Sequence, residues 1–495
     1  MGTNLAGIAP ELALTATIFV LVVVDIVLRG HAARRRVVGG VAILGLVATA
    51  LAFAALPADA GPLFHGMLAL DGFAVFFKGL FLAAAFLAIL FGAISDEIQR
   101  SRYGEYLILL LCLTLGLSLL AAARNLLMIY LSLELVSLPS YILAGFRRGD
   151  RQSSEAALKY VIFGAASSGL MLYGFSLLYG LAGTLDVSGI GPRVMSVASG
   201  GDAAGMLALA LAVLFALVGF GYKVAAVPFH MWCPDVYQGA PTPFVAFLSV
   251  GPKAAGMAAL LRFLLLGFGA PHGWLPAGAF PWPALIGILS VATMTVGNLI
   301  AIAQENVKRL LAYSSIAHAG YMLMAVAVGS DAGVRAVMLY LPIYLFMNMG
   351  AFLAVMAVRA PSGDESIAAY RGLGARSPFL AVTLAIFLFS LTGLPPLAGF
   401  IGKFYLFAAL LSTRLTFFYV VALIGVLNSV ISLYYYVRIV RAMFLEKAPA
   451  EAAGAFAPGR ASAVLLAVCA IPTVLLGIWW GPLAGLVAQA AALAR

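Results

Sequence analysis

The chain has 495 residues, of which 64% are hydrophobic and 10% are charged, and its mean hydropathy is +1.07. A soluble domain of this composition would aggregate through its apolar surface, so we predict a polytopic membrane protein. The net charge of +10 does not indicate a nucleic-acid partner, because the basic residues stand singly or in small groups between apolar runs.

Apolar runs long enough to cross a bilayer recur along the whole chain. We predict about 14 spanning helices, at residues 12–28, 37–56, 70–94, 106–122, 126–146, 156–181, 206–231, 242–266, 282–303, 310–328, 335–358, 378–411, 416–444 and 461–492. Pro228 interrupts the seventh run, and Pro395 and Pro396 split the twelfth, so both helices are predicted to be broken. The predicted fold class is an all-α polytopic membrane protein.

The basic residues fall mainly on one side of these spans. Loops after odd-numbered spans hold 18 Lys and Arg residues, whereas loops after even-numbered spans, with the last residue of the chain, hold 5. Because an excess of Lys and Arg marks cytoplasmic loops, both termini are predicted to lie outside the cytoplasm. Six basic residues fall inside spans: Lys78, Lys159, Lys223, Lys253, Arg262 and Lys403.

Lys223 and Lys253 lie on either side of the predicted break in the seventh span. An ammonium group in hydrocarbon costs about 3 kcal/mol on insertion scales, so a chain that keeps two beside a helix break is expected to use them. Glu134 is the acid nearest the middle of a span, about 12 Å from its start. A Glu–Lys pair in lipid has two nearly balanced protonation states, as a proton relay requires. The alternative is a structural ion pair between helices.

A short internal repeat relates the two broken spans. The pattern Gly-Phe-x-x-Lys that ends at Lys223 recurs 180 residues later and ends at Lys403. At the same offset Lys159-Tyr160 corresponds to Leu339-Tyr340, and Lys159 is an auxiliary candidate. Five spans separate the copies, so the repeats are predicted to be inverted, as in transporters with broken midplane helices. The predicted division is a three-helix segment at 1–104, inverted repeats at 105–267 and 268–445, and a C-terminal helix at 446–495.

Other candidate sites carry weaker signals. His230 and Cys233 are three residues apart but lack a third metal ligand, so His230 is better interpreted as a polar relay group or a packed histidine. His318 is similar, with Ser314, Ser315 and Tyr321 as nearby hydroxyl groups. We find no pattern of a nucleotide site, haem ligand pair or hydrolytic triad, and expect no cofactor or metal on this chain.

Three stretches resemble the antiporter-like membrane subunits of respiratory complex I. They are AAVPFHMWCPDVYQGAPTPFVAFLSVGPKAAG at 225–256, NVKRLLAYSSIAHAGYML at 306–323 and GLPPLAGFIGKFYLF at 393–407. The resemblance covers roughly spans two to thirteen. The residues around 232–256 are most similar to the subunit N branch of the bacterial enzyme, whereas subunit M is expected to hold glutamate where Lys403 stands.

The resemblance implies fourteen helices around two inverted five-helix repeats. It also implies a Glu–Lys pair at Glu134 and Lys223, a connecting lysine at Lys253 and an exit lysine at Lys403. Our hypothesis is that protons from the cytoplasm load Lys223, pass Lys253 and His230 with the help of water, and leave outside from Lys403.

The setting implied by the resemblance is the inner membrane of a bacterium, with both termini in the periplasm. Partners would be lipid and other membrane subunits of complex I, while NADH, FMN, iron–sulfur clusters and quinone would belong to partner subunits. The alternatives are a subunit of a multi-subunit cation/proton antiporter, which would exchange sodium without NADH, and a non-transporting scaffold, which would tolerate Lys223→Ala.

Overall fold

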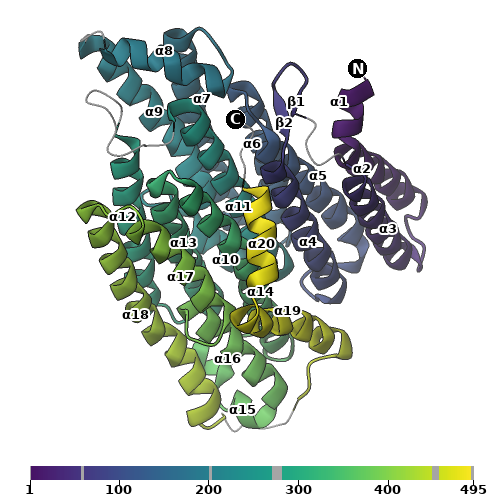
Figure 1. The fold of residues 1–495 in the computed structure, drawn as a ribbon. Helices are drawn as coiled ribbons and strands as arrows, with labels where there is room; N and C mark the ends of the chain where they lie inside the picture. The colour runs from purple at the N-terminus through teal and green to yellow at the C-terminus, as the bar shows by residue number, and fades with distance from the viewer. Residues whose placement is uncertain (1, 57–60, 200–202, 270–280, 449–455, 492–495) are drawn as a thin grey trace.

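The computed structural model describes residues 2–56, 61–199, 203–269, 281–448 and 456–491. Most of its helices lie side by side with similar tilts (Figure 1). Within these ranges, thirteen helices are long and apolar enough to cross a membrane, and two shorter apolar helices, α16 (Pro378–Thr392) and α17 (Ala398–Leu411), together correspond to the twelfth predicted span. The predicted polytopic, essentially all-α fold is confirmed.

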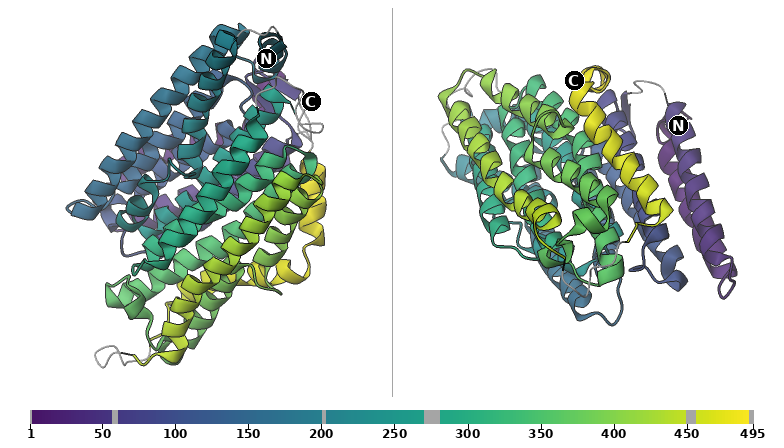
Figure 2. Two further views of the ribbon diagram at one scale, coloured as in Figure 1. Left: turned by 90° about the vertical axis from the view of Figure 1, so that its left-hand side faces the viewer. Right: turned by 90° about the horizontal axis from the view of Figure 1, so that it is seen from below.

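The N-terminal helices form one edge of the molecule, opposite α18 (Thr416–Leu445), as the view from below shows (Figure 2). The one departure from an all-α fold in the described residues is a short antiparallel hairpin that precedes α4 and was not predicted. Asp71 follows the hairpin and caps α4 by accepting a hydrogen bond of 2.8 Å from the Ala74 amide. This part of the chain comprises α1 (Gly2–Gly7), α2 (Ala9–Val27), α3 (Arg34–Ala54), β1 (Gly61–Leu63), β2 (Leu68–Leu70) and α4 (Gly72–Ile94).

The seventh span is broken as predicted. Helix α9 ends at Val224, α10 begins at Trp232, and Pro228 lies between them. Helix α8 was not predicted, and it packs against α7, α9 and α11. The elements of this region are η1 (Arg100–Arg102), α5 (Tyr103–Ala122), α6 (Leu126–Ala144), α7 (Arg151–Ala182), α8 (Val187–Ser199), α9 (Ala203–Val224), α10 (Trp232–Gly239) and α11 (Thr242–Phe268).

The twelfth span is also broken at its prolines, because residues 393–397, which include Pro395 and Pro396, separate α16 from α17. The repeat that relates these two breaks stays a prediction. The remaining elements of this region are α12 (Trp282–Ile302), α13 (Val307–Val328), α14 (Asp331–Ser362), η2 (Ile367–Tyr370) and α15 (Leu373–Arg376).

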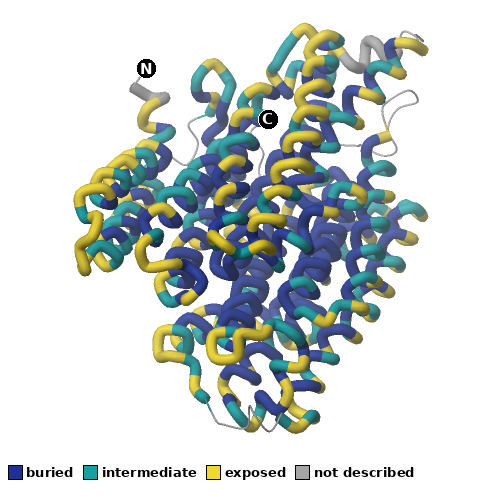
Figure 3. Tube along the Cα trace, turned by 180° about the vertical axis from the view of Figure 1, so that it is seen from behind, coloured by how far each residue is buried: buried dark blue, intermediate teal, exposed yellow. Residues whose placement is uncertain are grey.

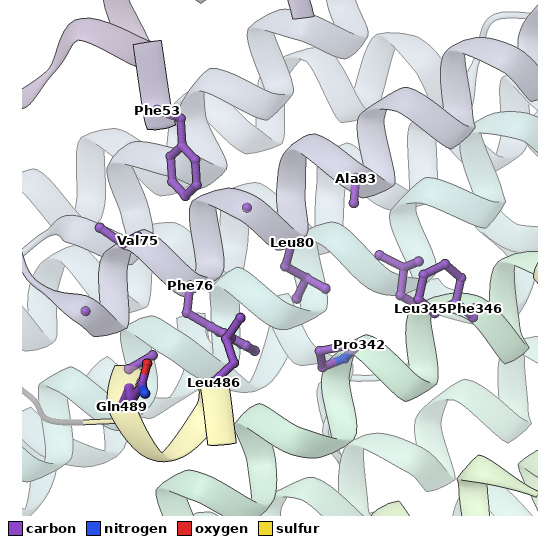
Figure 4. A pocket seen from close by; sticks show the side chains of 13 residues that line it. Phe53, Val75, Phe76, Leu80, Ala83, Pro342, Leu345, Phe346, Leu486 and Gln489 are labelled. Carbon is purple, nitrogen blue, oxygen red and sulfur yellow. The ribbon is translucent and has the colours of Figure 1, made fainter. Parts of the chain in front are cut away.

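The C-terminal span differs from the prediction of one helix over 461–492. It consists of α19 (Arg460–Ile478) and α20 (Gly481–Ala490), with non-helical backbone at Trp479. The reason is Pro482, which would remove a backbone donor from one continuous helix but is favoured in the first turn of a new helix. Helix α20 packs on α4 and α14 and closes an apolar cavity of about 530 Å³ between them (Figure 4). The predicted relay residues do not line this cavity.

Helices α11 and α13 form the centre of the molecule and are surrounded on all sides (Figure 3). Helices α12 and α13 meet almost backbone to backbone. A Cβ atom on Gly297 would lie 2.8 Å from the amide nitrogen of Ala317, and one on Gly320 would lie 2.5 Å from that of Met294. Only glycine fits at these two positions, so the contact fixes how α13 is rotated toward its neighbours.

Candidate functional site

Three of the predicted lysines are deeply buried. Lys223, Lys253 and Lys403 are 5%, 2% and 4% exposed, so their ammonium groups must be satisfied by the protein itself. Lys223 stands at the end of α9 and Lys403 near the start of α17, each beside one of the two broken helices, while Lys253 lies inside α11. Two of the three buried ammonium groups therefore lie beside a helix break.

The contact between the predicted Glu–Lys pair is indirect. Lys223 Nζ donates a hydrogen bond of 2.8 Å to the Ser137 hydroxyl on α6. Glu134, one turn earlier on the same helix, is within electrostatic range of Lys223, yet no ion pair within 4.0 Å joins the two groups in the described structure. Glu134 Oε1 is buried and has no hydrogen-bond partner among the described residues. The Ser137 hydroxyl itself donates to the Leu133 carbonyl at 2.6 Å and not to Glu134.

Lys253 is held by Ser315 on α13. Its ammonium donates to both the backbone carbonyl and the hydroxyl of Ser315. Tyr344 on α14 donates a second hydrogen bond of 2.9 Å to that hydroxyl, and its ring centroid lies 5.9 Å from Lys253 Nζ. Ser315 therefore joins the three central helices at one point.

His318, one turn after Ser315, lies between two of the lysines. It is within electrostatic range of both Lys253 and Lys403. Its Nδ1 shares a hydrogen bond of 2.5 Å with the Tyr340 hydroxyl, and its ring stacks against the Tyr340 ring at 6.0 Å. An imidazole can donate a proton from one nitrogen and accept one on the other, so this position suits transfer between the lysines.

Lys403 occupies the far end of the group. Its ammonium donates to the carbonyl of Thr392 at 2.8 Å and to the Ser429 hydroxyl at 3.0 Å. Thr392 is the last residue of α16, so the cation sits at the negative end of a helix dipole. Lys403 Nζ also lies 4.4 Å from the centroid of the Tyr321 ring, whose edge approaches the His318 ring at 5.7 Å.

The two auxiliary candidates lie apart from this group. His230 is buried in the segment between α9 and α10, and its Nδ1 has no hydrogen-bond partner among the described residues. Lys159 is 37% exposed and forms ion pairs with Glu155 at 2.7 Å and Asp235 at 2.6 Å. Asp235 is also paired with Arg309, and although burial opposes it, its hydrogen bonds to Lys159 and Arg309 keep the Asp235 pKa below its usual value.

Several partners of the lysines were not identified from the sequence. Ser137, Tyr344, Thr392 and Ser429 all come from helices other than the one that carries the lysine they surround, at separations in the chain such as 11 residues for Thr392 and 86 for Ser137. Ser and Tyr are common in this chain, and no spacing rule links positions on different helices. A buried serine one turn from Glu134 was the one available signal.

The chain matches known membrane proteins over most of its length. Residues 123–432 match the family model described as NADH:quinone oxidoreductase/Mrp antiporter, TM. The chain is 49% identical over 487 residues to NADH-quinone oxidoreductase subunit N of Anaeromyxobacter sp. (strain Fw109-5), covering 96% of this chain and 94% of that one. It is 50% identical over 510 residues to subunit N 2 of Sorangium cellulosum (strain So ce56), covering 99% and 98%.

Solved structures agree with these relatives. A chain of respiratory complex I from Thermus thermophilus with bound aureothin superposes with a TM-score of 0.78 at 34% identity, covering 97% of this chain and 99% of that one. A chain of the Mrp complex from Dietzia sp. DQ12-45-1b shares the fold, with a TM-score of 0.77 at 23% identity and 97% of each chain covered. The buried lysines and broken helices thus lie in a known architecture, and the chain belongs to the NADH:quinone oxidoreductase/Mrp antiporter family of membrane proteins.

Proposed function

We propose that this chain is a proton-translocating membrane subunit of an NADH:quinone oxidoreductase. It relays protons through Lys223, Lys253 and Lys403, and electron transfer in partner subunits drives the relay. The cofactors NADH, FMN, iron–sulfur clusters and quinone belong to those partners. Relatives at 49% and 50% identity over nearly the whole chain carry the name of this subunit, which favours it over the cation/proton antiporter.

The observation that carries the relay is a series of buried polar and aromatic side chains between two of the lysines. It leads from Lys253 to Ser315 and Tyr344 by hydrogen bonds, and then through ring contacts of Tyr344 with His318 at 5.2 Å and of His318 with Tyr321 to Lys403. Buried hydroxyl and imidazole groups can accept and pass protons where bulk water is excluded. A purely structural role would not require a histidine between two lysines.

The relay has a simple sequence of steps. A proton from the cytoplasm loads Lys223, and the charge on Glu134 changes how tightly Lys223 holds it. Lys253 takes the proton next and hands it through His318 to Lys403, from which it leaves on the opposite side. His318 takes the linking role that the sequence suggested for His230. Each proton moved against the membrane potential requires about 2.3 kcal/mol per 100 mV, so the stroke must be coupled to redox energy.

The proposed setting is the bacterial inner membrane, with both termini in the periplasm and with lipid and other membrane subunits as neighbours. The excess of Lys and Arg on odd-numbered loops supports this orientation. Cysteines introduced as Arg148→Cys and Arg414→Cys, both at exposed positions, should be labelled from opposite sides of sealed vesicles. Labelling of both cysteines from the same side would overturn the proposed orientation.

The decisive experiment is Lys223→Ala in the assembled complex. Inverted membrane vesicles with equal amounts of complex should acidify more slowly on addition of NADH, whereas the exposed loop variant Lys447→Ala should acidify like the wild type. Normal acidification by Lys223→Ala would refute the relay and favour a scaffold. Sodium-dependent proton exchange without NADH would instead support the antiporter.

A further inference from the structure

We propose that Glu97 is a positioning residue for the relay, because its buried carboxylate anchors the first turn of α11 to α13 and α14 and so holds Lys253 against Ser315. The inference rests on the proposed function. Glu97 lies in the loop between α4 and α5 and was not among the candidates found from the sequence.

The Glu97 carboxylate caps α11. It accepts a hydrogen bond of 2.9 Å from the Thr242 amide and another of 2.5 Å from the Thr242 hydroxyl. Thr242 is the first residue of α11, where backbone N–H groups have no partner inside the helix. Lys253 lies eleven residues further along the same helix, about 16 Å away. A shift of the first turn along the helix axis therefore moves the lysine.

Two cations lie beside this carboxylate. Arg359, near the end of α14, approaches Glu97 Oε1 at 3.4 Å, and Lys308, at the start of α13, is in electrostatic range. The side chains of Glu97 and Lys308 are both 0% exposed. Lys308 Nζ also donates a hydrogen bond of 2.9 Å to the carbonyl of Ala240, just before α11. The first turn of α11 is thus tied to both of its central neighbours.

Glu365 completes the cluster and balances its charge. Its carboxylate lies 3.3 Å from Lys308 Nζ and 3.2 Å from Arg359 Nε, so two anions face two cations. The backbone holds Glu365 in place, since its carbonyl accepts from the Val307 amide at 2.8 Å. The cluster of Glu97, Lys308, Arg359 and Glu365 therefore links loops as well as helices, at the predicted cytoplasmic ends of the helices that carry the relay.

Glu97 acts as a fixed charge and not as a proton carrier. Burial alone would raise its pKa, but Lys308, Arg359 and the Thr242 hydrogen bonds outweigh burial and lower the pKa of Glu97 below its usual value. The carboxylate is therefore ionised at neutral pH. Asp96, its neighbour in the chain, is 59% exposed and lies 3.7 Å from Arg359 without contacting α11, which makes it a matched control.

The test compares Glu97→Gln, Glu97→Asp and Asp96→Asn in the assembled complex. Protons pumped per NADH oxidised should fall at least twofold in Glu97→Gln, fall less in Glu97→Asp, and stay at the wild-type value in Asp96→Asn. A role in packing alone predicts the reverse order for the first two, because glutamine keeps the size of glutamate and aspartate does not. That reverse order, or a normal ratio in Glu97→Gln, would overturn the proposal.

A second measurement does not depend on pumping. Cys233 in α10 is fully buried within electrostatic range of Lys253, so its alkylation by a membrane-permeant maleimide reports on packing beside α11. With the other two cysteines, Cys112 and Cys469, replaced by Ala, Glu97→Gln should speed Cys233 alkylation at least threefold, and Asp96→Asn should not. Unchanged alkylation in Glu97→Gln would refute the anchoring of α11.

Different results would refute the proton relay and the positioning role of Glu97. If Lys223→Ala pumps normally, the relay is wrong, and faster Cys233 alkylation in Glu97→Gln would still establish the anchor of α11 while removing its link to pumping. If Glu97→Gln does not assemble, the milder Thr242→Val removes one of the two hydrogen bonds to Glu97 and should give an intermediate pumping ratio. A wild-type ratio and alkylation rate in Thr242→Val would then overturn the positioning role.

Discussion

Lys223 Nζ donates a hydrogen bond of 2.8 Å to the Ser137 hydroxyl. In the described structure it forms no direct ion pair with Glu134, which precedes that serine by one helical turn. A direct ion pair would stabilise the charged state of both groups. The Ser137 hydroxyl instead accepts from Lys223 and donates to the Leu133 carbonyl at 2.6 Å, so Ser137 is the side chain that holds the Lys223 ammonium.

Ser137→Ala should therefore slow NADH-driven pumping. Losing a hydrogen bond to a charged group costs about 1.5–3 kcal/mol, which corresponds to about a tenfold slower transfer at the lower end. The measurement is the initial rate of vesicle acidification at equal assembly. Ser132→Ala on the same helix is the control, because the buried Ser132 hydroxyl has no hydrogen-bond partner among the described residues. Equal rates in the two variants would contradict this prediction.

The two buried histidines should behave differently. His318→Leu removes the group between Lys253 and Lys403 and should abolish most of the proton transfer through this chain. His230→Leu should leave most of it, because no hydrogen bond joins the His230 ring to any of these lysines among the described residues and its Nδ1 has no partner there. Acidification rates of the two variants decide the matter, and a larger loss in His230→Leu would show that the relay passes through the helix break instead.

Substitutions of Lys403 should rank in the order lysine, glutamate, alanine. A protonated glutamic acid at this position can donate to the Thr392 carbonyl, and an ionised one can accept from Ser429, so Lys403→Glu keeps a group that binds and releases protons. Lys403→Ala keeps none. We expect partial pumping by the glutamate variant and several-fold less by the alanine variant, measured at equal assembly. If Lys403→Ala pumps as well as the wild type, Lys403 is not part of the relay.

Arg262 should matter for stability rather than for transfer. Its guanidinium pairs with Asp71 at 2.6 Å, and their side chains are 0% and 3% exposed. Arg262→Met leaves the buried Asp71 carboxylate without its cation, which typically lowers the free energy of unfolding by about 3–5 kcal/mol. The purified complex should denature at a lower temperature, and adding Asp71→Asn should restore part of the loss, because asparagine still caps α4. Arg36→Met, at an exposed position, serves as the control.

Much of the fold follows from local signals in the sequence. Apolar runs predict the spans because backbone polar groups in lipid must be satisfied within a helix. Pro228, Pro395 and Pro396 predict the two breaks, since each proline removes a backbone donor. Helix α8 and the hairpin were missed because neither crosses the membrane, so neither has an apolar run of spanning length. The split at Trp479 was missed because the flanking residues on both sides are apolar.

The site was predictable in part. A lysine inside an apolar run is costly enough to be noticed in one sequence, and all three lysines proved to be buried. Their partners depend on how separate helices pack, as with Ser137 for Lys223 and Thr392 for Lys403. The Glu97 cluster was missed because its members lie in loops or at helix ends, where charged residues are ordinarily solvated.

The close contact of α12 and α13 at Gly297 and Gly320 limits how the relay can work. A helix held backbone to backbone against its neighbour cannot turn about its own axis or slide without a steric clash. The moving part of each stroke must therefore be small: a ring flip of His318, a swing of a lysine tail or a reoriented hydroxyl. The relay therefore depends on motions of side chains between rigid helices, and not on helices that rock against one another.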